Sequence, residues 1–470
     1  MKKILFILAI SIGTYYVNAQ EALTLYNMEG LNQSIQYNPS FIPSNKWYMG
    51  IPGLSSTSVL FTNSGFTWRD LHHRNADDSM TLDVENAINK LKDKNFISFS
   101  VRSNIIEGGF FVKKNFISFN VSEKANFNLI FPRELFELLF YGNGAFIGQE
   151  VDLRRMGFDA THYREYAIGW ARELNKKVTL GTRLKYLYGM ENYSSAKTDL
   201  NFYTSPDDYT LELHSDYVIN TSGTSNDTTG NSGNYVFGLK NTGLGADISA
   251  TYRYNDRWKI NASIIDIGYI NWKSNVKNIV AVSGDYTFRG IDINAFLSDD
   301  STSSFESVTD SISDAFTPDE TYESYKSWLP AHIYMNVSYR IDQRMTASGL
   351  IHAQCFRNTV QPTFTAALNR KVSNHFTASL SYSMINHHLN NLGVGFGVNA
   401  GALQFYMITD NIIGTISPLN NHLTHVQFGF NLIFGRPVYK KLTTDYGVQN
   451  KSLAPIDAGQ VPDNTNTKED

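Results

Sequence analysis

The sequence contains a single cysteine, Cys355, and no long apolar run after its first residues. One cysteine cannot form an internal disulfide, so a secreted chain of this length would be stabilised by its fold alone. A helical membrane protein needs several apolar stretches of about 20 residues, and the mean hydropathy of −0.27 agrees with their absence. The sequence therefore excludes a disulfide-rich scaffold and a helical membrane protein.

Excess positive charge and catalytic signatures are also lacking. Because 40 basic residues face 44 acidic ones, nucleic acid is not an expected partner, since phosphate binding needs a basic footprint. No nucleophile elbow, zinc-binding helix, phosphate loop or paired-cysteine motif occurs. The His-Ser-Asp run at 214–216 and the histidine pairs at 72–73 and 387–388 consist of adjacent residues, which point to opposite faces of a strand. We predict no enzyme activity, no catalytic or metal site and no cofactor.

The N-terminus has the layout of a secretory signal. Two lysines precede an apolar run at residues 4–12, and small or modest side chains lead to Ala19. We predict that residues 1–19 are a signal peptide, cleaved between Ala19 and Gln20. The residue directly after the cut is Gln20 and not a cysteine, so a lipid-anchored lipoprotein has no attachment point. Loss of the two lysines would lower the net charge from −4 to about −6.

Aromatic residues are abundant, at 13% of the sequence, and apolar side chains recur with a period of two. In 423–434 large apolar groups alternate with small or polar ones. In 178–188 and 244–254 the alternation places Arg183, Lys185, Asp247 and Arg253 opposite the apolar face, and in 391–400 it does the same for Gly393, Gly395 and Gly397. Strands of soluble sandwiches are about five or six residues long, whereas about ten residues match a tilted strand that crosses a bilayer. We predict an all-β, transmembrane antiparallel β-barrel of roughly 14 strands over 20–434, in the outer-membrane lipid; a soluble barrel or repeated sandwich is the alternative.

The strand boundaries follow from the same alternation. A repeat of residues 94–99 at 114–119 supports growth by hairpins, with Glu107-Gly108-Gly109 allowing a sharp turn or bulge. Candidate strands, some of which must be loop extensions, are 55–62, 96–103, 106–113, 116–122, 124–131, 160–171, 177–190, 197–204, 208–216, 244–254, 257–267, 278–288, 331–341, 345–355, 360–369, 375–386, 391–400, 402–409 and 423–434.

One segment breaks the period. Residues 132–140 start at a proline and carry apolar residues at helical spacing, and a glycine-rich stretch, 141–144, ends them. We predict a short amphipathic helix here. It would either plug or gate the lumen or, as the simpler interpretation, cap one mouth of the barrel.

Two loops and a tail differ in composition from the strands. Residues 217–234 are rich in Ser, Thr, Asn and Gly and indicate an extracellular loop. Residues 290–326 are strongly acidic, but their carboxylates lack the spacing of a 12-residue calcium loop, which favours a solvated loop. Residues 435–470 lose the period and are predicted to be a periplasmic tail, free to bind a partner or to remain disordered.

Several motifs together resemble a known group of proteins. They are Leu25-Tyr26-Asn27-Met28, Gln36-Tyr37-Asn38-Pro39-Ser40-Phe41-Ile42-Pro43, Tyr141-Gly142-Asn143-Gly144, Tyr163-Arg164-Glu165-Tyr166-Ala167, Gly243-Leu244-Gly245-Ala246-Asp247, Asp266-Ile267-Gly268-Tyr269-Ile270-Asn271-Trp272 and Phe428-Gly429-Phe430-Asn431-Leu432-Ile433-Phe434-Gly435-Arg436. The chain resembles uncharacterised outer-membrane barrels of Bacteroidota, grouped as a domain of unknown function. More loosely it is similar to the PorP/SprF barrels associated with type IX secretion and gliding, and to FadL-type hydrophobic-solute channels.

Two functions are compatible with these features. In the first, the barrel is a channel for small or hydrophobic solutes, with Arg183, Lys185, Asp247 and Arg253 lining its lumen and the 132–140 helix restricting it. In the second, it is a non-conducting anchor or accessory for a type IX secretion, gliding or surface-adhesion partner. We expect a filled lumen to favour the anchor and an open or laterally gated lumen to favour the channel.

Overall fold

The computed structural model describes residues 22–75, 77–223, 240–288, 318–356, 359–385 and 388–435. The predicted signal peptide, its cleavage site and, apart from Gly435, the predicted tail lie outside these residues. None of the helices in the described part of the chain has the length and apolar character needed to cross a membrane.

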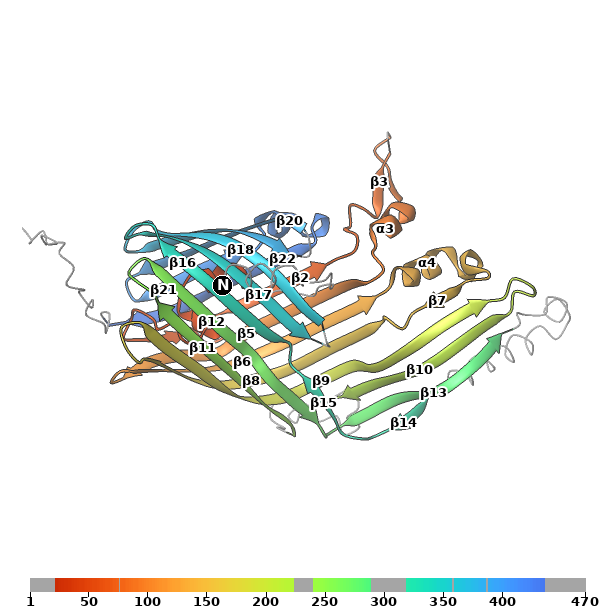
Figure 1. Ribbon diagram of the computed structural model, residues 1–470, viewed down its shortest axis with the longest axis horizontal. Coiled ribbons are helices and arrows are strands. Elements are labelled where there is room, and N and C mark those ends of the chain that lie inside the picture. Colours follow the sequence, from red (N-terminus) through yellow and green to blue (C-terminus); the bar gives the residue numbers. More distant parts are fainter. Residues whose placement is uncertain are drawn as a thin grey trace, which may run out of the picture.

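The described strands close into an antiparallel barrel of fourteen strands, which confirms the predicted fold (Figure 1). Two short strands, separated by residues 51–56, share one position and close the wall, because both pair with β22 on one side and β5 on the other. In order around the wall the strands are β1 (Trp47–Gly50) with β2 (Thr57–Asn63), β5 (Asn95–Val112), β6 (Asn115–Phe131), β8 (Gly157–Glu173), β9 (Val178–Thr204), β11 (Asn241–Arg253), β12 (Trp258–Trp272), β16 (Ala331–Arg340), β17 (Met345–Phe356), β18 (Thr359–Lys371), β19 (Phe376–Ile385), β20 (His388–Ala400), β21 (Leu403–Thr409) and β22 (Leu423–Phe434).

The remaining elements lie outside the wall or inside the lumen. They are α2 (Leu23–Asn27), the 3₁₀ helix η1 (Asn32–Gln36), β3 (His72–Arg74), β4 (Met80–Leu82), α3 (Val84–Lys90), α4 (Arg133–Tyr141), η2 (Asn143–Phe146), β7 (Glu150–Asp152), β10 (Leu211–Ser222), β13 (Val276–Phe288), β14 (Asp319–Thr321), β15 (Tyr325–Trp328), α8 (Ile412–Ile416) and η4 (Pro418–Asn420). We call the barrel end at which residues 113–114 and 254–257 turn the short-turn end. The opposite end, which carries α3 and α4, is the long-loop end.

The outer surface of the wall is an apolar band. In β12, Ile260 and Ile267 are exposed while Asn261 and Ser263 face inward and are buried. Exposed aromatic residues, Trp258 among them, cluster at the short-turn end. From Trp258 to Tyr269, about 11 residues that rise about 3.3 Å each at a tilt of about 45° span about 25 Å, the height of the apolar band of a transmembrane barrel. The alternation predicted from the sequence is therefore the inside–outside pattern of the wall.

Several predicted strand limits are wrong because strands run on past the expected turns. The first hairpin turns at Lys113, not at residues 107–109, and a bulge between Asn104 and Ile106 lets β5 pair with β6 along its whole length. The 27-residue β9 joins two predicted strands: its first half pairs with β11 and its second half with β10, beyond the barrel. This sheet of β9, β10 and β13 extends the long-loop end (Figure 1).

The two predicted loops are shorter than expected. Residues 217–222 belong to β10, β14 lies within the acidic segment 290–326, and β15 begins in that segment and ends at Trp328. Although both loops are polar in composition, β14 forms a strand by pairing with β13, and β15 forms one by pairing with β12. The rest of both loops, 224–234 and 290–317, lies outside the described residues.

The predicted helix is present as α4, preceded by Pro132. It lies at the rim of the long-loop end (Figure 1) and none of its residues is buried. The ring of Phe136 packs against Phe66 and Phe131, at centroid distances of 5.4 and 5.1 Å. The interpretation of this helix as a lumenal plug is therefore wrong, because its apolar face packs on rim residues.

Candidate functional site

The lumen is filled by the segment that precedes the first barrel strand. Residues 22–46 run through the barrel interior, and all but Glu29, Gly30 and a few residues near their C-terminal end are buried. We call this segment the plug. Its Tyr26 ring stacks on Tyr334 of β16 at 4.8 Å and meets Phe41 edge-on at 5.4 Å, so the plug has an apolar centre of its own.

The start of the plug is fixed to the end of β21. The Asp410 carboxylate accepts hydrogen bonds from the backbone N–H groups of Leu23, at 3.2 Å, and Thr24, at 2.8 Å. The Thr24 hydroxyl lies 2.8 Å from the Ser381 hydroxyl of β19. All these groups are buried, so their hydrogen bonds are costly to break without water.

A row of glycines in β20 makes room for the plug. A β-carbon at Gly393 would lie 2.5 Å from Thr24 Oγ1, and one at Gly395 would lie 2.6 Å from Met28 Sδ. The third, Gly397, faces Leu31 at 2.9 Å. These are the residues that the period of two placed on the inner face of this strand, and the structure gives the reason for their size.

The middle of the plug is held by polar side chains of the wall. Gln33 and Gln36 both donate hydrogen bonds to the Glu107 carboxylate of β5. The Arg102 guanidinium donates to the Tyr37 hydroxyl at 3.0 Å. Further along the plug, the wall lies against its backbone at Gly181, where a β-carbon would lie 2.3 Å from the Pro39 carbonyl carbon.

Six charged side chains meet beside the plug, on five neighbouring strands. They are Lys124 of β6, Glu165 of β8, Arg183 and Lys185 of β9, Asp247 of β11 and Asp266 of β12. The Lys185 ammonium lies 2.6 Å from Asp247, 2.6 Å from Asp266 and 3.6 Å from Glu165. The Arg183 guanidinium bridges Glu165, at 3.1 Å, and Asp247, at 3.0 Å, and also donates to the Gln36 carbonyl of the plug. Three cations balance three anions, so this charge cluster is buried without net charge.

Asp266 reaches the charge cluster through a β-bulge. Its φ of +59° is left-handed, and the register of β12 against β11 shifts at this point. Ile265 and Asp266 are consequently both buried, although adjacent strand residues normally face opposite sides. A left-handed non-glycine residue is strained, and such strain concentrates at functional sites.

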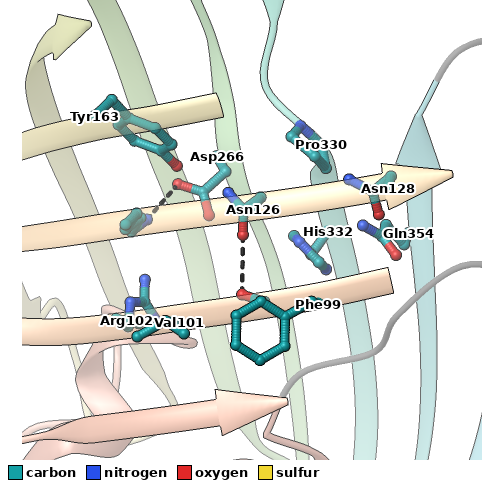
Figure 2. Close-up of a pocket in the computed structure, with 12 residues that line it drawn as sticks. Phe99, Val101, Arg102, Asn126, Asn128, Tyr163, Asp266, Pro330, His332 and Gln354 are labelled. Atoms are coloured by element: carbon teal, nitrogen blue, oxygen red, sulfur yellow. Dashed lines mark hydrogen bonds and ion pairs between the residues drawn. The ribbon is translucent and has the colours of Figure 1, made fainter. Parts of the chain in front are cut away.

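A polar chamber of about 40 Å³ lies next to the charge cluster. Tyr163 and Asp266 stand on one side of it and His332 and Gln354 on the other, as Figure 2 shows. Asn126 accepts a hydrogen bond from Ser100 at 2.9 Å on its lining. The chamber exceeds the roughly 10–15 Å³ that one water needs and is lined by polar partners, so it has room for ordered water.

A wider cleft of about 800 Å³ opens at the long-loop end. One side of the cleft is apolar and consists of Trp328 at the end of β15, the next residue Leu329, Phe356 of β17 and Val360 of β18. The other side is polar and includes Asp159 of β8 and residues of β9. The residues that border this cleft, Leu329 and Phe356, continue directly to the chamber residues Pro330 and Gln354 of the same chain segments. Cleft and chamber therefore lie next to each other.

The sequence located part of this site. Arg183, Lys185 and Asp247 do face the lumen and meet in the charge cluster. Arg253 lies apart, near the short-turn end, where it pairs with Glu173 at 3.1 Å.

The alternation missed three members of the cluster. Lys124 and Glu165 lie on the inner face of their strands and the same pattern could have located them, but Asp266 could not be found because its bulge breaks the alternation. Among the described residues no group of histidine, cysteine and acidic side chains could hold a metal ion. His73, on β3, is exposed outside the barrel.

The barrel is similar to several solved transporters. It aligns with a FadL homologue of Pseudomonas aeruginosa at 9% identity and a TM-score of 0.42, over 90% of this chain and 100% of that one. It aligns with the toluene transporter TbuX of Ralstonia pickettii at 7% identity and a TM-score of 0.40, over 86% and 95%. For the toluene transporter TodX of Pseudomonas putida the values are 9%, 0.36, 89% and 94%.

No protein with a curated description matches the sequence. A family model does match, over residues 39–410, which include the last part of the plug and thirteen of the fourteen wall positions in full. The chain therefore belongs to the family of unknown function DUF5723.

Proposed function

We propose that this protein is an outer-membrane channel for small hydrophobic solutes, closed at rest by its own plug. The observation that carries the proposal is the polarity of the wall beneath the plug. Buried wall residues include Ser98, Asn120, Asn261, Gln427 and the six members of the charge cluster. Burying polar groups costs free energy that an apolar filling would avoid. A polar wall is useful when water enters the lumen, which requires the plug to move.

The cleft indicates the class of solute. Its volume lies in the range of about 300–1,000 Å³ typical of small-molecule sites, and one side of it is apolar. Trp328 lines this cleft, is 67% exposed and lies edge-on to the Tyr269 ring at a centroid distance of 5.5 Å, so its ring is available to an apolar molecule in the cleft. A small apolar molecule would cover this ring before it passes toward the chamber.

The filled lumen by itself favours the second hypothesis, a non-conducting anchor for a secretion or adhesion partner, as expected from the sequence, whereas the polar wall around the plug favours the channel. In an anchor the plug would be a permanent core and its movement would have no consequence. The two proposals therefore differ in one measurable property, namely whether the barrel conducts when the plug is free to move.

A reversible lock on the plug tests the channel. Thr24→Cys with Ser381→Cys, in a Cys355→Ser background, places two thiols where hydroxyls now lie 2.8 Å apart, close to the S–S distance of about 2.05 Å. We expect the oxidised variant to lose the single-channel openings of the wild-type protein in planar bilayers, and reductant to restore them.

The control is a lock within the wall. Thr365 of β18 and Ser383 of β19 have buried hydroxyls 2.9 Å apart, so Thr365→Cys with Ser383→Cys forms the same bond without touching the plug. Oxidation should leave its openings unchanged. If both locked variants conduct like the wild-type protein, the plug is not a gate; if no form ever conducts, the channel proposal fails and the anchor is favoured.

Removal of the aromatic side of the cleft should slow solute entry. We expect Trp328→Ala to reduce the uptake rate of the apolar fluorophore 1-N-phenylnaphthylamine by intact cells about fivefold, corresponding to about 1 kcal/mol of lost aromatic contact. The exposed Trp258→Ala, at the other end of the barrel, serves as the matched control. Equal uptake by both variants would show that the cleft is not the entrance.

A further inference from the structure

A second recessed surface lies at the long-loop end. The excursion between β2 and β5, which carries β3, β4 and α3, rises above the barrel (Figure 1). A groove of about 700 Å³ runs along it and adjoins a pocket of about 210 Å³ at the loop between β21 and β22. Arg69, Asp70 and Asn420 line both, so the two recesses form one continuous surface, which we call the loop groove.

An aromatic platform stands in the loop groove. Trp68 is 52% exposed, and the His72 ring lies beside it at a centroid distance of 4.1 Å. The Trp68 backbone fixes this pair, because its N–H donates to the Leu419 carbonyl at 2.9 Å and its own carbonyl lies 2.9 Å from His72 Nδ1. The exposed part of the Trp68 ring, held by the neighbouring His72 ring, is preorganised to receive a flat apolar ligand face.

Hydrogen-bond donors surround the platform. The Arg69 and Lys90 side chains have no acidic partner within the described ranges, whereas the charge of Arg74, which also lines the loop groove, is neutralised by its ion pair with Asp78. Both free cations are exposed. Burial lowers the pKa of the neighbouring His422, so its imidazole stays neutral near pH 7 and adds no charge.

Hydrogen-bond acceptors are equally present. One oxygen of the Asp70 carboxylate accepts from the Thr67 N–H and hydroxyl, and one oxygen of the Asp83 carboxylate accepts from the Asn86 N–H. The second oxygen of each carboxylate takes part in no hydrogen bond among the described residues. Two cations and two carboxylates with unused capacity balance one another, so the loop groove selects neither an anion nor a cation.

We propose that the loop groove binds neutral saccharide chains. Each sugar hydroxyl is one donor with two acceptor lone pairs, which matches a surface where Arg69 and Lys90 donate and Asp70 and Asp83 accept. The Trp68 ring contacts the apolar face of a sugar ring. This binding does not depend on whether the lumen conducts.

The test measures binding of the full-length, detergent-solubilised protein to immobilised dextran, laminarin and galactomannan, with polygalacturonate as an acidic comparison. We expect at least one neutral glycan to bind, with little change in affinity between 50 and 500 mM salt because no net charge is neutralised. Trp68→Ala and Arg69→Gln should each weaken that binding at least tenfold.

Two variants at the opposite end of the barrel are the controls. Trp258→Ala removes an exposed tryptophan and Lys176→Gln removes an exposed cation, and neither should change glycan binding. Heat-modified migration in gels verifies that every variant is folded. The proposal is overturned if no neutral glycan binds, if polygalacturonate binds alone or more tightly with steep salt dependence, or if the loop-groove variants and the controls bind equally.

Discussion

Lys185→Met is expected to lower the free energy of unfolding by about 3–5 kcal/mol, the usual cost of breaking a buried ion network on one side. The Lys185 ammonium is fully buried and lies within 3.6 Å of three carboxylates. Methionine fills a similar volume but leaves Glu165, Asp247 and Asp266 with only two cations. Urea unfolding in lipid vesicles, followed by tryptophan fluorescence, measures the change.

A second substitution should reverse most of this loss. Asp266→Asn in the Lys185→Met background removes one anion and restores the balance of charge. Asparagine tolerates the left-handed φ of +59° at this bulge better than most residues, so the backbone is expected to remain in place. If the double variant is as unstable as the sum of both single variants, the two residues do not act through a shared charge balance.

Gly181→Val is expected to open the barrel, raising the fraction of time spent conducting in planar bilayers at least tenfold. A β-carbon here would lie 2.3 Å from the Pro39 carbonyl carbon and 2.4 Å from the Ser40 nitrogen. These are backbone atoms, which cannot move aside as easily as the end of a flexible side chain can. The Ser40 N–H also loses its position 2.7 Å from the Ser249 hydroxyl, so the plug is displaced from the wall.

Gly349→Val is the matched control. Gly349 lies on β17, and a β-carbon added there meets no atom within 4 Å. Valine also suits a strand better than glycine, so this variant should fold and stay closed like the wild-type protein. Equal conductance of the two variants would mean that contact at Pro39 does not keep the plug in place.

The period of two was sufficient to predict the wall. Strand residues alternate faces regardless of what lies beyond them, and a barrel in lipid needs opposite polarity on its two faces. This is why Leu184 and Lys185 could be assigned to the outside and the inside from the sequence. Strand ends were harder to place, because pairing partners far along the chain determine them. β9 continues past Gly189 because β10 pairs with its second half on one edge, and β8 and β7 pair with parts of it on the other.

The plug could not be predicted from the period of two. Residues 22–46 have neither strand alternation nor a long helix, and nothing in their own sequence shows that a barrel will surround them. The sequence pattern made the short helix α4 the better candidate for a lumenal plug, yet its apolar face packs against rim residues such as Phe66. The polar side chain of Gln33 is explained only by its hydrogen bond to Glu107, which lies 74 residues later in the sequence.

The sequence by itself determined the class of fold and the polarity of its two surfaces, because both depend on local alternation. The tertiary structure decided which residues meet. Barrel closure brought Asp410 to Thr24, 386 residues apart, and a single bulge turned Asp266 inward to complete the charge cluster. Such contacts depend on the register and curvature of many strands together, so they cannot be predicted from any local sequence pattern.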